Sequence, residues 1–373
     1  MIYFFKFNKV LSIFGILLLI NGCLRKPKSS FNVNSTLKSE DDGGSSDGGV
    51  TTGDQDGGST DGDEDGGDDD QDEGIPPVVD KSDLKECSDW NEFLGVDDPF
   101  TCYVWHILAN GQLVKNLSRE NGNMANVVKL NDLNIGKTYS KYQGEGVRIH
   151  ISDTGFDHDH EDLFEHYDQE NSRNYRNSIT NPADPIETGS HGTMCGGLAG
   201  AVGGNNIGLL GVAWKATMSG DNFLGNQGQG QSMYVDLYQK NNSDSSKLIN
   251  IWSGSFGVSY SDRNFALAAH STRLSGDTSA AAVVHGANNN NILYFKANGN
   301  DGTKVGADGN MEGMASVYVI NAIAALGTNN EVVSYSTPGA NVTLSGYAHL
   351  GGRSLGTCTT KPNNKYTCAM NGT

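Results

Sequence analysis

The sequence predicts an α/β fold in which helices flank a parallel β-sheet. Short apolar segments typical of buried strands alternate along the chain with helical stretches, and this alternation indicates a parallel sheet covered by helices. Polar residues directly follow several of these segments, as expected where reactive groups gather at the carboxyl ends of parallel strands. The expected strands are residues 147–152, 248–252, 292–295 and 317–320, and the expected helices are residues 191–202 and 263–274.

Each element is expected for a local reason. The segment 147–152 is rich in β-branched residues and ends at Asp153, while the Gly/Ala-rich segment 191–202 favours a buried helix. The three later strands are short apolar runs, and the helical stretch 263–274 separates two of them. Ser255 and Asn300 stand just beyond expected strands, as Asp153 does. All three are therefore expected at one edge of the sheet.

Residues 1–22 are expected to be a lipoprotein signal peptide. Two lysines precede an apolar run, residues 10–20, that is too short to span a bilayer comfortably as a mature helix. Gly22 directly precedes Cys23 in a pattern that resembles a bacterial lipobox, after which the cysteine is acylated. Two or three acyl chains would hold the protein on a membrane. We therefore expect an exported protein anchored to the bacterial cell envelope, at the outer membrane or cell surface; the alternative is an ordinary signal peptide with an incidental cysteine.

Residues 23–75 are expected to be the lipid anchor and a disordered acidic tether. Residues 40–74 contain fifteen Asp or Glu and no Lys or Arg, diluted with Gly and Ser. Such a segment buries too little apolar surface to repay its ordering entropy. Without those fifteen residues the chain has 26 basic against 29 acidic residues, a net charge of −3, instead of the formal −18. The acidity therefore belongs mostly to the tether, and no nucleic-acid partner is expected.

Two short motifs supply an acid and a base for acyl transfer. Asp153-Thr154-Gly155 follows an expected strand, and His191-Gly192-Thr193 opens an expected helix 38 residues later. A serine nucleophile needs a base within hydrogen-bond reach, an acid that orients the base, and donors for the oxyanion. Each motif alone is weak evidence. Their combination in this order predicts the acid and base of a serine hydrolase.

Further motifs carry a family resemblance. Besides the Asp153 motif, these are Asp98-Pro99 with Trp105-His106, His191-Gly192-Thr193-Met194-Cys195-Gly196-Gly197, residues 205–213 (Asn-Asn-Ile-Gly-Leu-Leu-Gly-Val-Ala), Ser253-Gly254-Ser255-Phe256-Gly257 and Ala297-Asn298-Gly299-Asn300-Asp301-Gly302. With these motifs, residues 95–373 resemble the subtilisin superfamily of serine proteases and, within it, the kexin and proprotein-convertase branch. The resemblance implies a subtilisin-like sheet and hydrolysis of polypeptide substrates.

The resemblance assigns roles to these residues. Asp153 is expected to orient the base His191, and Asn300 is expected to donate its side-chain amide to the oxyanion, with Asn298 as the neighbouring candidate. The expected substrate-binding strand is Ser253, Gly254, Ser255, Phe256 and Gly257. The acidic pair that gives convertases their preference for basic residues is not found after Gly257. Cleavage after Arg or Lys is therefore left open.

The family's catalytic serine follows a Gly-Thr pair, which here is Gly372-Thr373. We therefore expect residues 85–373 to be a peptidase domain presented without its nucleophile helix, and the chain as given to be inactive. The alternatives are a non-catalytic, peptide-binding surface lipoprotein derived from a protease, and a decayed gene product. The protein is expected to be a monomer.

A calcium site is also implied by the resemblance. Hard oxygen ligands from distant segments suit the six- to eight-fold coordination of calcium. The implied ligands are the side chains of Asp98, Asp162 and Asn205 and the carbonyl groups of Val202, Ile207 and Leu209. By contrast, the run from His158 to Glu161 is expected to be a solvated surface, because adjacent loop residues rarely converge on one ion.

The exported context permits disulfides among the cysteines that remain after Cys23 is acylated. Pairing Cys87 with Cys102 and Cys358 with Cys368 joins local partners and leaves Cys195 alone, although the sequence does not exclude other connectivities. Cys195 lies one helical turn from His191. The convertase branch carries a cysteine there that is not the nucleophile, so a serine mechanism is expected rather than a thiol one.

Overall fold

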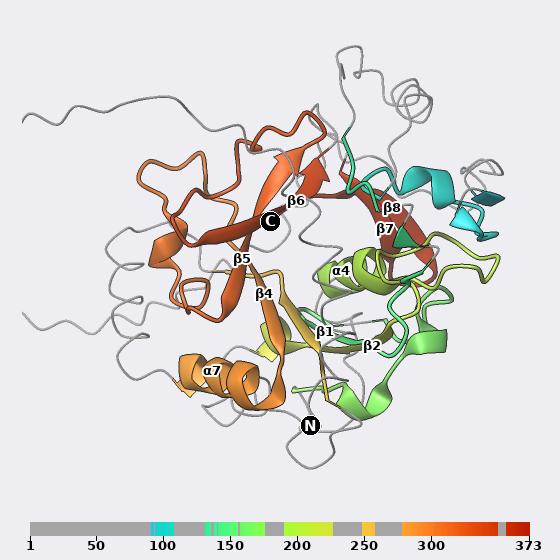
Figure 1. Ribbon diagram of the computed structural model, residues 1–373, viewed down its shortest axis with the longest axis horizontal. Helices are drawn as coiled ribbons and strands as arrows, with labels where there is room; N and C mark the ends of the chain where they lie inside the picture. The colour runs from blue at the N-terminus through green and yellow to red at the C-terminus, as the bar shows by residue number, and fades with distance from the viewer. Residues whose placement is uncertain are drawn as a thin grey trace, which may run out of the picture.

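The computed structural model describes residues 91–107, 131–175, 190–226, 248–257, 278–349 and 356–373, apart from positions 93, 136, 137, 140 and 156. Its centre is a six-stranded sheet in the order β2-β1-β3-β4-β5-β6, and every neighbouring pair in it is parallel (Figure 1). The α/β fold class is thus confirmed. The strands are β1 (Arg148–Ser152), β2 (Thr217–Asp221), β3 (Ile251–Gly254), β4 (Leu293–Ala297), β5 (Ile320–Gly327) and β6 (Val342–His349).

Helices on the two faces of this sheet cover two separate hydrophobic clusters. The first cluster includes Ile149 and Ile151 of β1 together with Cys195 of helix α4 (His191–Gly200). The second includes Trp252 of β3 and Val283 of helix α7 (Thr278–Asn290). Because side chains alternate along a strand, one strand can serve both faces. The remaining helical elements are the 3₁₀ turns η3 (Thr101–Tyr103), η5 (Phe164–His166), η6 (Gln169–Asn171), η8 (Phe223–Asn226) and η10 (Gly309–Met311).

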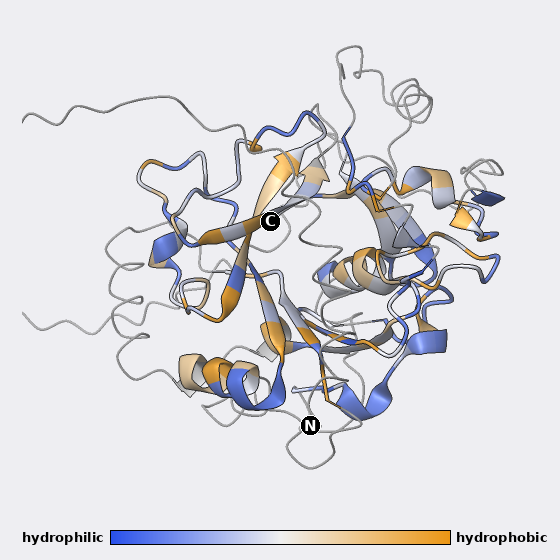
Figure 2. Ribbon diagram, in the orientation of Figure 1, coloured by the Kyte–Doolittle hydropathy of each residue, from blue (hydrophilic) through white to orange (hydrophobic). Residues whose placement is uncertain are grey.

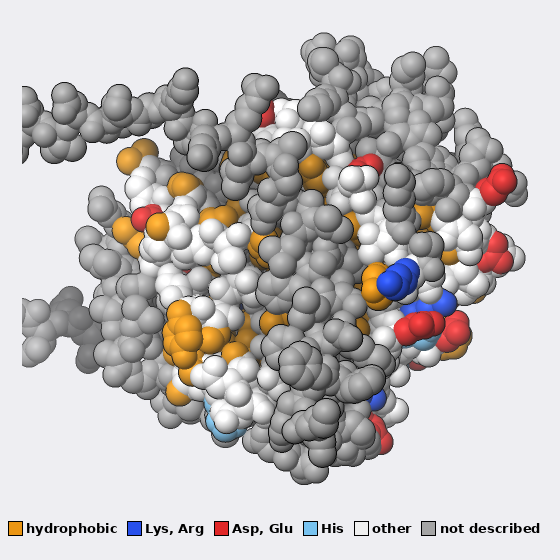
Figure 3. All heavy atoms as spheres, viewed as in Figure 1, with side chains coloured by type: hydrophobic (Ala, Val, Ile, Leu, Met, Phe, Trp, Pro, Cys, Tyr) orange, Lys and Arg blue, Asp and Glu red, His pale blue; other side chains and the backbone are white. Residues whose placement is uncertain are grey.

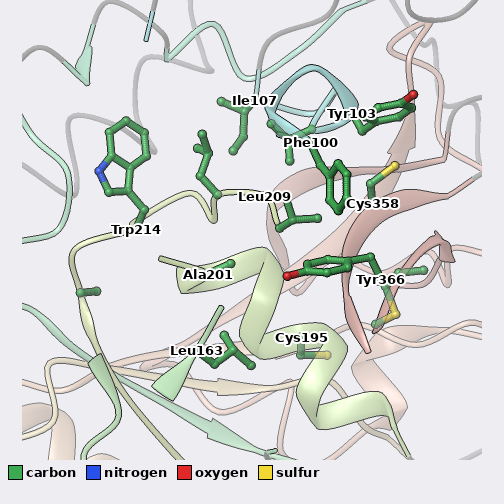
Figure 4. Packing of buried hydrophobic residues seen from close by; sticks show 14 of the residues in the cluster. Phe100, Tyr103, Ile107, Leu163, Cys195, Ala201, Leu209, Trp214, Cys358 and Tyr366 are labelled. Carbon is green, nitrogen blue, oxygen red and sulfur yellow. The ribbon is translucent and has the colours of Figure 1, made fainter. Parts of the chain in front are cut away.

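An antiparallel hairpin, β7 (Thr357–Lys361) and β8 (Lys365–Met370), packs against α4. The hydroxyl of Thr359 donates to the carbonyl of Met194 at 2.6 Å, and that of Thr360 donates to the carbonyl of Thr193 at 2.8 Å. A Cβ at Gly197 would lie 2.2 Å from Thr360 Oγ1, so only glycine allows this approach. Figure 4 shows Tyr366 and Cys358 of the hairpin meeting Phe100 and Leu209 in the first cluster.

Several expected elements differ from the observed ones. The strand expected over residues 317–320 is wrong, because these residues form turns and β5 begins only at Ile320. Hydrogen bonds from the amide of Val317 to the carbonyl of Met314, and from Ile320 to Val317, hold the turns. The strand expected over residues 248–252 begins three residues later, as β3. Helix α4 ends at Gly200 rather than at residue 202.

Other expectations concern residues whose structure is not described. The helix expected over residues 263–274, the signal peptide, the tether, Cys23 and Cys87 all lie outside the described residues. Within the described ranges, no helix is long and apolar enough to cross a bilayer. In Figure 2 the 3₁₀ turns near residues 164–171 are hydrophilic apart from Phe164, whereas α7 carries both hydrophilic and hydrophobic residues. On the face drawn in Figure 3, acidic and basic side chains lie close together at one edge.

Candidate active site

Strand β1 and helix α4 bring the acid and the base of the two short motifs together. Asp153 follows the last residue of β1, and His191 is the first residue of α4. Nδ1 of His191 lies 2.9 Å from each carboxylate oxygen of Asp153. Asp153 is fully buried, whereas the His191 side chain is 26% exposed. The pair therefore combines a buried acid with a base that solvent or a substrate can reach.

Glycines allow this approach of helix and strand. A Cβ at Gly192 would lie only 2.0 Å from the carbonyl oxygen of Gly155, and Gly155 itself has a φ of 133°, which disfavours other residues. The hydroxyl of Thr154 accepts the amide of Gly192 at 3.1 Å, and the amide of Thr154 donates to Asp153 Oδ1 at 2.7 Å. The turn after β1 thus fixes both the carboxylate and the start of the helix.

Cys195 lies beneath the histidine. Its Sγ is 3.7 Å from His191 Nδ1 and 3.8 Å from Asp153 Oδ2. The charge of a Cys195 thiolate, followed by that of Asp153, raises the pKa of His191, against the lowering effect of burial. A general base starts neutral and becomes positively charged when it accepts a proton, so the buried Asp153 carboxylate at 2.9 Å would stabilise the imidazolium that forms on His191.

The two candidate oxyanion donors have different environments. Asn298 is buried; its Nδ2 donates to the Thr337 carbonyl at 2.7 Å, and its Oδ1 accepts the side-chain amide of Asn341 at 2.6 Å. Asn300 is exposed and lies at the carboxyl edge of the sheet, three residues beyond β4. Of the two, only Asn300 has a side chain that a substrate could meet.

Thr373 lies against the Asn300 loop. Its amide donates to Asn300 Oδ1 at 3.1 Å, and its hydroxyl oxygen accepts the amide of Gly299 at 3.1 Å. The preceding Gly372 has a φ of 132°, and its amide donates to the hydroxyl of Tyr335 at 3.2 Å. A residue bonded to Thr373 would thus start beside the candidate oxyanion donor.

The expected substrate-binding strand corresponds to the end of β3 and the three residues after it. Ser253 and Gly254 close the strand, and Ser255 to Gly257 follow it. The Phe256 ring packs against Trp252 and Phe223, with centroids 6.1 and 5.1 Å away. The buried Lys296 ammonium lies 4.5 Å from the Phe256 ring centroid and donates to the Phe256 carbonyl. The contacts of Phe256 thus fix the segment against the protein interior, and the segment ends at the exposed Gly257.

Two buried carboxylates face the loop that follows α4. Asp98 accepts the amides of Gly204 at 2.7 Å and Asn205 at 3.0 Å. Asp162 accepts the Asn205 side-chain amide at 3.2 Å and the Leu209 amide at 2.9 Å. Oδ1 of Asn205 accepts the Ile207 amide, and the Val202 amide donates to the Asp162 carbonyl. The structure therefore places the two carboxylates beside the loop that contains the other four residues implied as calcium ligands, with contacts through side chains and amides.

The electrostatics of this region favour a cation. Burial raises the pKa of Asp98 to about 6 and raises that of Asp162, and the nearby charges add to both shifts. Among the described residues, neither carboxylate has a lysine or arginine partner. Burial and the charges of Asp162 and Glu161 also raise the pKa of Tyr366, whose hydroxyl donates to Glu161 at 3.0 Å. Oxygen donors without a compensating cationic side chain suit a hard divalent ion.

The sequence comparisons agree with this geometry. The model of the subtilase family matches residues 144–373, which include the Asp153 and His191 motifs and the loop of Asn300.

The chain belongs to the subtilase family.

Curated relatives of this subtilase include convertases. Neuroendocrine convertase 2 from Bos taurus is 27% identical over 243 residues, covering 63% of this chain and 35% of that protein. Furin-like protease 2 from Drosophila melanogaster is 38% identical over 96 residues, covering 25% of this chain and 6% of that protein. The match to neuroendocrine convertase 2 thus covers about a third of the length of that protein.

Solved structures show the same fold. The serine protease of Aeromonas sobria matches with a TM-score of 0.56 at 20% identity, covering 80% of this chain and 56% of that one. The same protease in complex with its chaperone matches with a TM-score of 0.56 at 23% identity, covering 65% of this chain and 47% of that one. A protease from Pseudoalteromonas arctica matches with a TM-score of 0.52 at 19% identity, covering 74% and 82%.

The cysteines of this subtilase are partly described. Cys358 and Cys368 form a disulfide across the β7–β8 hairpin, and Cys195 is free and buried. Cys102 is disulfide-bonded, and its expected partner Cys87 lies outside the described residues.

In the run from His158 to Glu161, Nε2 of His158 lies 3.4 Å from the exposed Asp159. His160 is instead fully buried and contacts the carbonyl of Lys365 in the hairpin, so the expected solvated surface is wrong at this residue, and the run does not converge on one point.

Sequence reasoning missed three polar groups of this subtilase: Tyr366 beside the buried carboxylates, Lys296 beneath Phe256, and a pair formed by His150 and Asp221. Nε2 of His150 lies 2.8 Å from Asp221 Oδ2, and both side chains are fully buried. The alternation of polar and apolar residues within β1 was the available signal for this pair. Polar residues at every second position of a buried strand indicate a polar network on one face.

Proposed function

We propose that the folded part of this chain is the catalytic domain of a serine endopeptidase that hydrolyses polypeptides. The contact between His191 Nδ1 and the buried Asp153 carboxylate carries this proposal. Membership of the subtilase family and the resemblance to convertases support it. We assign the nucleophile to a serine that directly follows Thr373, because Thr373 is bonded to the Asn300 loop.

In the proposed reaction, His191 Nε2 accepts the proton of the serine hydroxyl as the oxygen attacks the substrate carbonyl carbon. Asp153 holds Nδ1 and stabilises the imidazolium that forms. The negative charge develops on the former carbonyl oxygen, where the Asn300 amide would donate a hydrogen bond worth roughly 3–4 kcal/mol in the transition state. His191 then gives its proton to the leaving amine, and the resulting acyl-enzyme is hydrolysed by water with the same base.

The experiment uses a fluorophosphonate probe, which reacts with activated serines. We expect labelling of the gene product that continues with serine after Thr373, and loss of labelling in its His191→Ala variant. The chain of residues 1–373 serves as the control without the assigned nucleophile. Labelling of this shorter chain would show that the nucleophile has been misassigned. Peptide binding without labelling of the longer product would favour a non-catalytic binding function instead.

We further propose that calcium binds between Asp98, Asp162 and the loop from Val202 to Leu209. The ion would supply the positive charge that the two buried carboxylates lack among described side chains, and it would clamp three separate segments. Because it would bind only the folded state, it would stabilise the domain. Isothermal titration of the metal-free protein with CaCl₂ tests this site, and an unchanged affinity in Asp98→Asn would contradict it.

We also propose that Cys23 is acylated after removal of residues 1–22, and that the acidic segment 23–75 tethers the peptidase to the bacterial cell envelope. The basis is the lipobox-like sequence before Cys23 and the composition of the tether. Metabolic labelling with an alkyne fatty acid should modify the protein but not its Cys23→Ala variant. Equal labelling of both, or release of the unsubstituted protein into the medium, would contradict the anchor.

A further inference from the structure

A fully buried polar network links the two strands at one edge of the sheet. His150 and Ser152 project from β1, and Ser219 and Asp221 project from β2. Nδ1 of His150 lies 2.8 Å from Ser219 Oγ, and Nε2 lies 2.8 Å from Asp221 Oδ2. The hydroxyl of Ser152 donates to the other carboxylate oxygen, Asp221 Oδ1, at 3.1 Å. Asp221 is therefore the centre of the network.

Strand register explains how these residues meet. In the parallel ladder Ser152 is opposite Asp221 and His150 is opposite Ser219, so all four side chains share one face of the sheet. The alternate residues Ile149 and Ile151 pack into the first hydrophobic cluster on the opposite face. An apolar set would serve the fold at least as well, because burying polar groups costs desolvation energy even when they are hydrogen-bonded. The network therefore calls for a role beyond packing.

The network is not a second hydrolytic site, although it contains a serine, a histidine and an aspartate. All four side chains are almost completely buried, so no substrate can reach Ser219. The histidine nitrogens are also reversed: Nδ1 faces the serine and Nε2 faces the carboxylate. In the pair at the strand end, Nδ1 of His191 faces the carboxylate instead.

Asp221 also contacts the segments around the candidate active site. Ser152, its partner, directly precedes Asp153, and the Asp153 amide donates to the Asp221 carbonyl at 3.4 Å. Asp221 Oδ1 accepts the Phe223 amide at 2.9 Å, and the Leu224 amide donates to the Asp153 carbonyl at 3.1 Å. The Phe223 ring packs on Phe256 of the substrate-binding segment. The Asp221 carboxylate thus holds the side chain of the residue before Asp153 and the start of the turn whose Leu224 amide bonds the Asp153 carbonyl.

We propose that Asp221, held by His150, is a positioning residue that fixes Asp153 against His191 through Ser152 and the turn at Phe223. This inference rests on the proposed function in one respect, namely that Asp153 orients His191. The Asp153 amide bonds β2, and the Asp153 carbonyl bonds the turn that begins at Phe223. If Asp221 lost its hydrogen bonds, both attachments would shift, and the Asp153 carboxylate would move relative to His191. A displacement of about 1 Å is enough to cost roughly a hundred-fold in turnover.

The test reads the Asp153–His191 pair directly, without hydrolysis. NMR of ¹⁵N-histidine-labelled protein gives the pH at which His191 titrates and the resonance of its Nδ1 proton, with His191→Ala to assign the signals. The variant is Ser152→Ala, which removes one hydrogen bond to Asp221 without changing any charge. Since Asp153 raises the pKa of His191, a displaced Asp153 lowers it. We expect a fall of about one pH unit and a broadened Nδ1 proton resonance.

Ser172→Ala is the matched control. Ser172 is equally buried, and its hydroxyl bonds the Asp168 carbonyl at 2.9 Å and the Gly220 amide at 3.1 Å, but it does not touch the Asp221 carboxylate. We expect it to leave both His191 signals unchanged. Asp221→Asn should lower the His191 titration at least as much as Ser152→Ala; if it fails to fold, Ser152→Ala decides.

The proposal is overturned if Ser152→Ala titrates like the unsubstituted protein, or if Ser172→Ala shifts His191 equally. Because the readout is the histidine signal and not hydrolysis, it can succeed even if fluorophosphonate labelling fails. A failure here, with labelling intact, would remove the positioning role of Asp221 and leave the proposed function standing.

Discussion

Two histidine–aspartate pairs involve neighbouring parts of β1, and they differ in their exposure to solvent. His191 and Asp153 meet at the carboxyl edge of the sheet, where the histidine side chain is 26% exposed. His150 and Asp221 meet between two strands, where neither side chain is exposed. Both contacts are at hydrogen-bond distance. Residue types and distances therefore do not decide which pair can react. Access to substrate and the neighbouring loop of Asn300 decide it.

The largest expected effect separates the two histidines by activity. His191→Gln should reduce kcat on the order of a million-fold, as loss of the corresponding base does in subtilisin, because the proposed mechanism assigns the serine proton to His191. The same substitution at His150 should cost at most about a hundred-fold, since it acts only through position. Steady-state kinetics on a peptide substrate, with the product that carries the serine after Thr373, measures both.

A similar loss of kcat in both variants would contradict the distinction between a base and a positioning network. Circular dichroism of each variant is the control that excludes unfolding as the cause of any loss.

The next effect concerns stability. Asp221→Ala should lower the free energy of unfolding by roughly 1–3 kcal/mol for each buried group that loses its hydrogen bond to the carboxylate, namely His150 Nε2 and the Ser152 hydroxyl. Replacing both members, as in His150→Met with Asp221→Leu, should cost less than the single change, since it removes the buried histidine together with its partner. Urea unfolding measures both variants. A double variant that is less stable than the single one would show that the pair itself stabilises the fold.

The buried carboxylates at the loop give a pH-dependent effect. Burial raises the pKa of Asp98 to about 6 and also raises that of Asp162, so the folded state binds more protons than the unfolded state. Without a cation, stability should therefore fall as the pH rises from about 4 through about 6, by about 3 kcal/mol from Asp98 alone. Calcium at a hundred times its Kd should restore about 2.7 kcal/mol at neutral pH.

Thermal unfolding with EDTA and with CaCl₂ across this pH range tests the prediction. Asp98→Asn should remove most of the pH dependence and the calcium response, whereas Asp159→Asn at an exposed position is the matched control. Stability that rises with pH in EDTA would contradict the raised pKa values.

The smallest expected effect concerns Cys195. The charge of a Cys195 thiolate and that of Asp153 both raise the pKa of His191, but Asp153 lies 2.9 Å from Nδ1 and the sulfur lies 3.7 Å away. Cys195→Ala should therefore lower the pH at which His191 titrates by less than Asp153→Asn does. Histidine NMR between pH 6 and 10 measures both variants. A larger shift in Cys195→Ala would mean that the sulfur, and not Asp153, sets the charge of the base.

The same contrast explains what the sequence could predict. The Asp153 and His191 motifs are local, because each combines a functional residue with the glycine that its turn or helix start requires. The parallel sheet followed from short apolar runs, and family membership confirmed the resemblance. By contrast, the bond between His150 and Asp221 spans 71 residues and depends on the register of β1 and β2. No local pattern encodes that register.

The misplaced strand has a similar cause. Residues 317–320 form a short apolar run, as a buried strand would, but the amides of Ser316 and Val317 donate to the carbonyls of Glu312 and Met314, which closes turns there and delays β5 until Ile320. Likewise, the sequence favoured Asn300 over Asn298 from the small residues around it. The structure gives the physical reason for this choice: Asn298 Nδ2 donates to Thr337, and Asn298 Oδ1 accepts from Asn341, so the Asn298 side chain is already hydrogen-bonded within the protein.

The central claim is that the Asp153–His191 pair activates a serine directly after Thr373. Mass spectrometry of the fluorophosphonate-labelled longer product tests it most directly, because it identifies the modified residue. The account predicts a single adduct on that serine, which is absent in His191→Ala. An adduct on any other residue, or an adduct on that serine that persists at full rate in His191→Ala, would contradict it.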